Sequence, residues 1–90
     1  MGGPPVDRQG HAQLHRQEGA APRLLRDLFG LTASEALVAI EVGRGTGVNA
    51  TARTLSIATG TAHTHLARVF AKTGTSRQAE LAHLLARLAP

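Results

Sequence analysis

One stretch of the chain, residues 59–73, concentrates hydroxyl, imidazole and basic side chains that could bind a polyanion. At 100° per residue, its spacing predicts a helix with an aliphatic inward face and a small, polar and basic outward face. The inward face comprises Ala62, Leu66, Val69 and Thr73, with His65 and Phe70 at its margins. The outward face comprises Gly60, His63, Thr64, Ala67, Arg68, Ala71 and Lys72. An outward face without acidic residues suits a DNA groove.

The positive charge of the chain is concentrated in its second half. The sequence has ten Lys and Arg residues against six Asp and Glu residues, for a formal net charge of +4. Residues 1–41 contain four basic and five acidic residues, whereas residues 42–90 contain six basic residues and one acidic residue, Glu80. Because acidic partners are scarce there, we expect four basic side chains to contact phosphates rather than to form a merely solvated surface. These are Arg53, Arg68, Lys72 and Arg77.

Composition argues against several other classes of function. The chain has no cysteine, which excludes disulfides and thiolate metal sites, and no apolar run approaches the roughly 20 residues that span a bilayer. Two phenylalanines are its only aromatic residues, too few for the stacking that holds single-stranded nucleic acid. No nucleophile, histidine and carboxylate form a catalytic constellation, so we predict no enzymatic activity, cofactor, metal or small-molecule ligand. We expect a soluble, cytoplasmic, nucleoid-associated protein.

The tract before Pro22 is expected to contribute little to the core, whereas the short helix that follows it is expected to dock on the domain. Residues 1–21 are rich in Gly, Pro, Gln and His, which predicts a disordered tail. His11 and His15 would share a helical face there, but two ligands make an incomplete metal site. Residues 22–30 predict a short helical linker that begins at a proline and ends at a glycine. Its apolar stripe comprises Leu24, Leu25, Leu28 and Phe29.

Residues 31–90 are expected to form an all-α domain of four helices. Thr32 and Glu35 fit a capping box, which predicts a helix from Ala33 to about Val42. Its inward face comprises Val38, Ala39 and Val42, while Leu37 and Ile40 imply a second neighbour, for which residues 24–29 are the candidate. A glycine-rich turn over 43–47 follows; it lacks the preceding strand and the Gly-Lys-Ser/Thr sequence of a phosphate-binding loop.

A helix over 48–55, capped by Gly47 or Asn49, and the helix over 59–73 are joined by a short turn, which matches the outline of a helix-turn-helix. Gly74 is the expected end of the second of these helices. A last helix, begun by Thr75 with Gln78 or by Ser76 alone, has an apolar stripe that a second copy of the chain could cover. The stripe comprises Leu81, Leu84, Leu85 and Leu88.

From Phe29 to Leu88, about two thirds of the chain, the sequence closely resembles the LuxR-type (GerE-type) helix-turn-helix of bacterial transcription regulators. The match is ordered and without gaps, which makes it more specific than any single motif. The residues that carry it are Leu31, Thr32, Glu35, Val38, Val42, Gly45, Ala52, Leu55, Ile57, Thr61, Ala62, His65, Leu66, the run from Val69 to Gly74, Arg77, Glu80 and Leu81.

The resemblance implies sequence-selective binding of double-stranded DNA in transcription regulation, with the third of four helices in the major groove and the fourth forming a homodimer contact. At matching positions it implies base contacts by His63, Thr64, Ala67 and Arg68. It also implies phosphate contacts by Arg53, Lys72 and Arg77, and a dimer interface at Leu81, Leu84, Leu85 and Leu88. With about four basic residues per protomer, the logarithm of the binding constant should fall with the logarithm of salt concentration at a slope of roughly −3 to −4.

Three positions depart from the family pattern. Thr51 stands where a bulky aliphatic residue is usual, and Ala50 where a charged residue is usual. Ala58 replaces the usual Ser or Thr cap, which either moves the cap to Thr59 or costs roughly 1 kcal/mol of helix stability. An alternative function is a helical interaction module that dimerises with a related regulator without reading DNA. The chain is expected to be either a stand-alone unit or the C-terminal part of a longer regulator.

Overall fold

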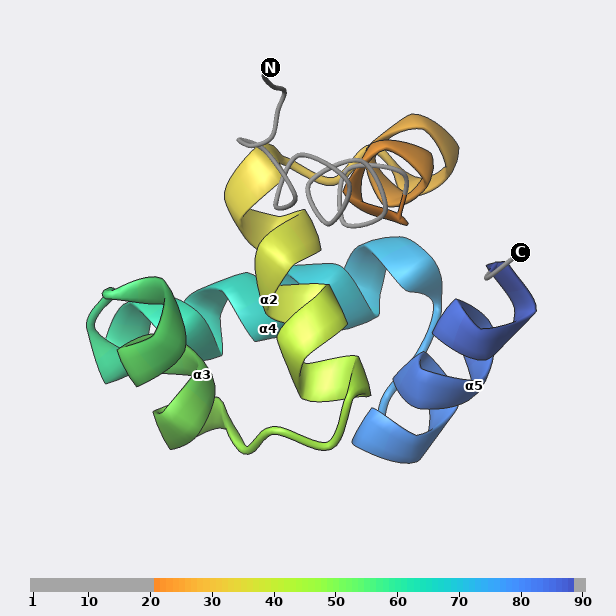
Figure 1. Cartoon of the computed structure of the whole chain (residues 1–90). Helices are drawn as coiled ribbons and strands as arrows, with labels where there is room; N and C mark the ends of the chain where they lie inside the picture. The colour runs from red at the N-terminus through yellow and green to blue at the C-terminus, as the bar shows by residue number, and fades with distance from the viewer. Residues whose placement is uncertain (1–20, 89–90) are drawn as a thin grey trace, which may run out of the picture.

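The computed structural model describes residues 21–88, which form helices and connecting turns without strands (Figure 1). A helix over 21–29 precedes the four helices α2 (Ala33–Gly43), α3 (Val48–Leu55), α4 (Thr59–Thr73) and α5 (Gln78–Leu88). The predicted all-α class is confirmed. Apart from Ala21, which is already helical, the predicted tail lies outside the described residues, as do His11 and His15. None of the helices described is long and apolar enough to cross a membrane.

Helix α2 occupies the centre of the domain. It packs against α3, α4 and α5, and in Figure 1 α4 passes behind it while α3 and α5 lie on either side. The predicted capping box is present, because the Glu35 N–H donates to the Thr32 hydroxyl at 3.1 Å and the Thr32 N–H donates to the Glu35 carboxylate at 2.9 Å. The predicted inward residues Val38, Ala39 and Val42 are all buried.

A single hydrophobic core joins all of these helices except α3, which contributes partly buried side chains at its edge. Its buried members are Leu25, Leu31, Ala36, Val38, Ala39, Val42, Val69 and Leu81. Ile40 packs against this core as predicted, but Leu37 does not and is 45% exposed. The predicted second neighbour of this helix is confirmed, because α2 packs against α3, α4 and α5 and shares its core with Leu25 of the helix over 21–29, although Leu37 itself stays exposed.

The helix over 21–29 is part of this packing rather than a segment standing apart. Leu25 is completely buried in the core and Phe29 packs against it. The other two leucines of the predicted stripe, Leu24 and Leu28, are 39% and 58% exposed. This short helix buries only a narrow side against the small core. Of the predicted stripe, Leu25 and Phe29 therefore pack in or against the core, and Leu24 and Leu28 do not.

The turn between α3 and α4 is compact. Ser56 ends α3 with a left-handed backbone (φ 59°), and the Ile57 N–H donates to the Ala52 carbonyl at 2.9 Å. Helix α4 then begins at Thr59, and Ala58 occupies the cap position without a side-chain hydrogen bond. Of the two alternatives at this position, the shift of the cap to Thr59 is wrong. Gly47 takes the cap of α3, also without a side chain to help.

Helix α5 packs closely on the end of α2. A Cβ atom at Gly43 would lie 2.1 Å from the Leu85 methyl carbon, so the absence of a side chain there permits the approach. Leu81 is completely buried, and Leu84, Leu85 and Leu88 pack partly buried against the core. The Leu81 side chain is thus enclosed within its own chain, whereas Leu84, Leu85 and Leu88 keep part of their surface exposed. The dimer interface predicted at these four leucines stays a prediction.

Candidate nucleic-acid interface

Helix α4 separates its two faces as its sequence predicts. Ala62 and Val69 are buried, and Leu66 and Phe70 pack against the core. The four residues predicted to contact bases, His63, Thr64, Ala67 and Arg68, are all exposed. Gly60, Ala71 and Lys72, which complete the outward face, are exposed too. The result is a helix surface with hydrogen-bonding groups at intervals and little bulk between them.

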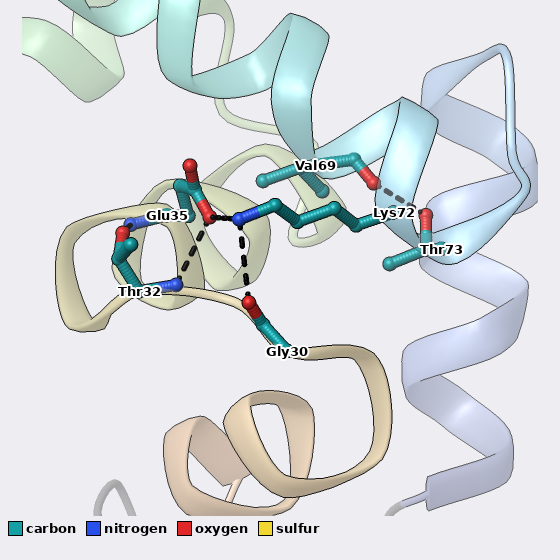
Figure 2. Close-up of polar contacts among 6 residues, drawn as sticks. All are labelled: Gly30, Thr32, Glu35, Val69, Lys72 and Thr73. Atoms are coloured by element: carbon teal, nitrogen blue, oxygen red, sulfur yellow. Dashed lines mark hydrogen bonds and ion pairs between the residues drawn. The ribbon is translucent and has the colours of Figure 1, made fainter.

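The last turn of α4 is fixed by local hydrogen bonds. The Thr73 hydroxyl donates to the Val69 carbonyl at 2.8 Å (Figure 2) and shares a hydrogen bond with the Thr75 hydroxyl at 2.8 Å. Gly74 then takes a left-handed backbone (φ 72°), as predicted for the residue that ends this helix. The Phe70 carbonyl accepts from the backbone N–H groups of Gly74 and Thr75. These bonds stop α4 after 15 residues and turn the chain toward α5.

Two further predicted phosphate contacts lie on neighbouring elements. Arg53 is exposed in the last turn of α3, and Arg77 is exposed immediately before α5. Within residues 21–88, the salt bridges join Arg44 to Glu41 and Lys72 to Glu35. Arg53, Arg68 and Arg77 thus have no carboxylate partner in the described part of the chain. Unpaired guanidinium groups can form bidentate hydrogen bonds with phosphate without first losing another partner.

Lys72 differs from those three arginines. Its Nζ donates to Glu35 Oε1 at 2.7 Å and to the Gly30 carbonyl at 3.3 Å, so the ammonium group is held between α4 and the start of α2 (Figure 2). The phosphate contact predicted for Lys72 stays a prediction, and it would have to compete with this pair. The pair was not predicted, because 37 residues separate its partners and no local spacing connects them.

Glu35 is an ionised carboxylate inside the domain, with only 1% of its residue surface exposed. Burial by itself raises the pKa of the carboxyl group, but the hydrogen bond from Lys72, the Thr32 N–H and the positive charges of Lys72 and Arg68 outweigh it. The pKa of Glu35 is therefore held below its ordinary value. The contribution of Arg68 also indicates that its charge lies near the same side of α4 as Lys72.

Two buried polar atoms in this part of the structure lack a hydrogen-bond partner: the Thr51 hydroxyl oxygen and His65 Nδ1. His65 is partly buried, as its position at the margin of the inward face predicts. Thr51 is completely buried in α3. Because a buried hydroxyl without a partner costs free energy and an aliphatic side chain would not, we expect the Thr51 hydroxyl to destabilise the packing of α3.

No protein-family model, curated protein or solved structure matches this chain. The exposed face of α4 and the unpaired basic side chains beside it are therefore the observations from which a function can be inferred.

Proposed function

We propose that this protein binds double-stranded DNA sequence-selectively and acts in bacterial transcription regulation, in the manner of the LuxR-type helix-turn-helix that its sequence resembles. In this proposal α4 enters the major groove, where His63, Thr64 and Arg68 can form hydrogen bonds with base edges and Ala67 allows close approach. Arg53 and Arg77 neutralise phosphates on either side. Two copies of the chain bind two half-sites, and the protein associates with the nucleoid.

The observation that carries the proposal is the exposed face of α4. Its inward residues pack in or against the core, its outward residues are exposed and, Lys72 apart, have no ion-pair partner in the described part of the chain, and no carboxylate belongs to α4. The few carboxylates nearby are already engaged: Glu35 binds Lys72, Glu41 binds Arg44, and Glu80 accepts from Ser76. Glu80 keeps its negative charge because Ser76 is neutral, but Arg53, Arg68 and Arg77, unpaired within residues 21–88, outweigh it, so the field beside α4 stays positive.

Fluorescence anisotropy with a diverse pool of duplex DNA tests this proposal. If Arg53 and Arg77 contact phosphates while Lys72 remains paired, the salt slope should be about −1.8 per protomer, from about −0.9 per phosphate, and about −2.7 if Arg68 also contacts a phosphate. Changing Arg53 or Arg77 to alanine should weaken binding equally for all sequences and reduce the slope by about 0.9. Changing Arg23, which is exposed on the helix over 21–29, to alanine is the matched control and should leave binding unchanged.

Substitution of Arg68 distinguishes a base contact from a phosphate contact at this position. Arg68→Ala should relax selectivity at one position of the bound sequence by about 1–3 kcal/mol if the guanidinium group reads a base. A uniform loss with a smaller salt slope would assign it to a phosphate instead. Binding to the pool that is undetectable, or that does not depend on salt, would reject the proposal.

The exposure of Leu24, Leu28 and Leu37 favours a second candidate, a helical module that pairs with a related regulator without reading DNA. The two candidates differ in which residues they need. If the protein still regulates transcription after Arg53, Arg68 and Arg77 are all changed to alanine, the interaction module is supported. Loss of function in that variant, with its far-UV circular dichroism unchanged, supports DNA binding.

A further inference from the structure

One ion pair joins two segments that are far apart in the sequence, residues 30–35 and the last turns of α4. Glu35 Oε1 accepts from the Thr32 N–H at 2.9 Å and from Lys72 Nζ at 2.7 Å, and Lys72 Nζ also reaches the Gly30 carbonyl at 3.3 Å (Figure 2). We refer to these four residues, Gly30, Thr32, Glu35 and Lys72, as the Glu35 cluster. It connects the end of the helix over 21–29, the first turn of α2 and the last turns of α4.

The helix over 21–29 is held at the same place by apolar contacts. Leu25 lies completely buried in the core cluster that contains Val69 of α4, three residues before Lys72. Gly30, whose carbonyl Lys72 binds, follows that helix directly. The helix over 21–29 and the C-terminal half of α4 therefore each contribute a buried residue to one core, and the hydrogen bond from Lys72 to Gly30 links α4 to the end of that helix.

The burial of Glu35 makes the polar contact costly to lose. A carboxylate that is 1% exposed cannot exchange its lysine for water without opening the first turn of α2. Lys72 is itself more than a third exposed, so it is the partner that a perturbation can remove. Loss of Lys72 would leave a buried charge next to the Thr32 N–H, and the capping box would loosen with it.

We propose that Lys72 is a positioning residue that couples the helix over 21–29 to α4, and that it does not contact phosphate. This inference rests on the proposed function only where it concerns DNA. When the helix over 21–29 is docked, the Glu35 cluster holds the last turns of α4 against α2 in the position that binds DNA. When that helix is withdrawn, the cluster loosens and DNA affinity falls.

The first test uses Lys72→Met in the full chain, with the salt dependence of DNA binding as the readout. A positioning role predicts that affinity falls by about fivefold or more, at the lower end of typical coupling between sites. The same role predicts an unchanged salt slope, because no phosphate contact is lost. A slope reduced by about 0.9, or an unchanged affinity, would overturn the inference.

The second test needs no DNA and uses amide hydrogen exchange of the free protein. Lys72→Met should speed exchange at Thr32, whose N–H donates to Glu35, and in the last turns of α4, while amides of α3 such as Ala52 keep their rates. Exchange that speeds equally in all helices would reveal only a global loss of stability, and unchanged exchange would reveal no coupling. Either result overturns the inference.

A third variant tests the route to the helix over 21–29. Leu25→Ala should loosen the docking of that helix and speed exchange in the last turns of α4. In the Lys72→Met background, the added effect of Leu25→Ala should be smaller than in the wild-type chain, because the polar contact is already gone. Equal effects in both backgrounds would refute the coupling. If Lys72→Met does not fold, Glu35→Gln keeps an oxygen acceptor, removes the charge and takes its place in all three tests.

Failure of this inference and failure of the proposed function can be told apart. If the wild-type protein does not bind DNA, the proposed function fails, and the exchange measurements still decide whether the Glu35 cluster couples the two helices. If the wild-type protein binds DNA and Lys72→Met reduces the salt slope, the function stands and Lys72 is a phosphate contact.

Discussion

Replacing Thr51 by valine should stabilise the domain. Thr51 is completely buried in α3, and its hydroxyl oxygen has no hydrogen-bond partner. A buried polar group without a partner costs about 1–3 kcal/mol, and a methyl group in its place adds apolar burial of about 0.8 kcal/mol. Valine has nearly the same shape and helix propensity, so neither packing nor helix formation opposes the change. Allowing for incomplete desolvation of the hydroxyl, we expect the free energy of unfolding to rise by about 1–2 kcal/mol.

Thermal and urea unfolding followed by far-UV circular dichroism can measure this gain. For a domain of this size, 1 kcal/mol corresponds to about 4–8 °C, so the melting temperature should rise by roughly 4–16 °C. Thr54→Val is the matched control, because Thr54 is exposed on the same helix, and its effect should stay within about 0.5 kcal/mol. Thr51→Ser keeps the hydroxyl and loses the methyl group, so it should be less stable than wild type.

The result that would refute this reasoning is a Thr51→Val protein no more stable than wild type, with Thr54→Val behaving as expected. It would mean that the hydroxyl group is satisfied in solution, by a water molecule or by a small shift of its neighbours. An increase that also appears in Thr54→Val would instead report the intrinsic preference of the helix for valine.

Further changes test other features of the fold. Ala58→Ser should supply the missing cap of α4 and raise the free energy of unfolding by about 1 kcal/mol, measured by urea unfolding; no gain would mean that the cap site is not as the structure has it. Ser56→Gly should relieve the left-handed backbone and stabilise by up to about 1 kcal/mol, whereas Ser56→Ala should not. Leu81→Ala should lower the free energy of unfolding by about 2–5 kcal/mol, independently of protein concentration. A loss that depends on protein concentration would instead support a dimer contact by Leu81. Because the pKa of Glu35 is lowered by folding, its ionisation stabilises the domain fully above about pH 4.3, and this contribution is lost as the pH falls through the folded-state pKa. The stability difference between wild type and Glu35→Gln should therefore shrink below that pH. A difference that stays constant would contradict the lowered pKa of Glu35. The comparison with Glu35→Gln is needed because the pKa of Glu80 is also lowered.

The capping box at Thr32 and Glu35 shows how local signals predict this fold. Its two hydrogen bonds join residues three positions apart, so the sequence contains everything needed to form them. The same holds for the end of α4 at Gly74, which depends on the backbone freedom of one residue. The missing cap at Ala58 was one of two alternatives in the sequence, and the structure decided between them.

The candidate interface was predictable for a similar reason. The inward and outward faces of α4 follow from a period of 3.6 residues, and the exposure of His63, Thr64, Ala67 and Arg68 is a direct consequence of burying Ala62 and Val69. What periodicity does not contain is how deep each inward residue lies. For that reason the sequence predicts the apolar stripes of the helix over 21–29 and of α5 but not the burial of their members: Leu28 is exposed and Leu81 is enclosed.

The sequence by itself determined the helices to within a few residues at each end and which side of α4 is basic, because caps, turns and periodicity act over a few neighbouring residues. Only the tertiary structure decided which charged side chains from distant parts of the sequence form ion pairs. Lys72 and Glu35 are brought to 2.7 Å by the packing of α4 on α2, and the Gly30 carbonyl, five residues before Glu35, also accepts from Lys72. Contacts of this kind depend on the relative placement of whole helices, which the burial of one shared core sets and no local pattern encodes.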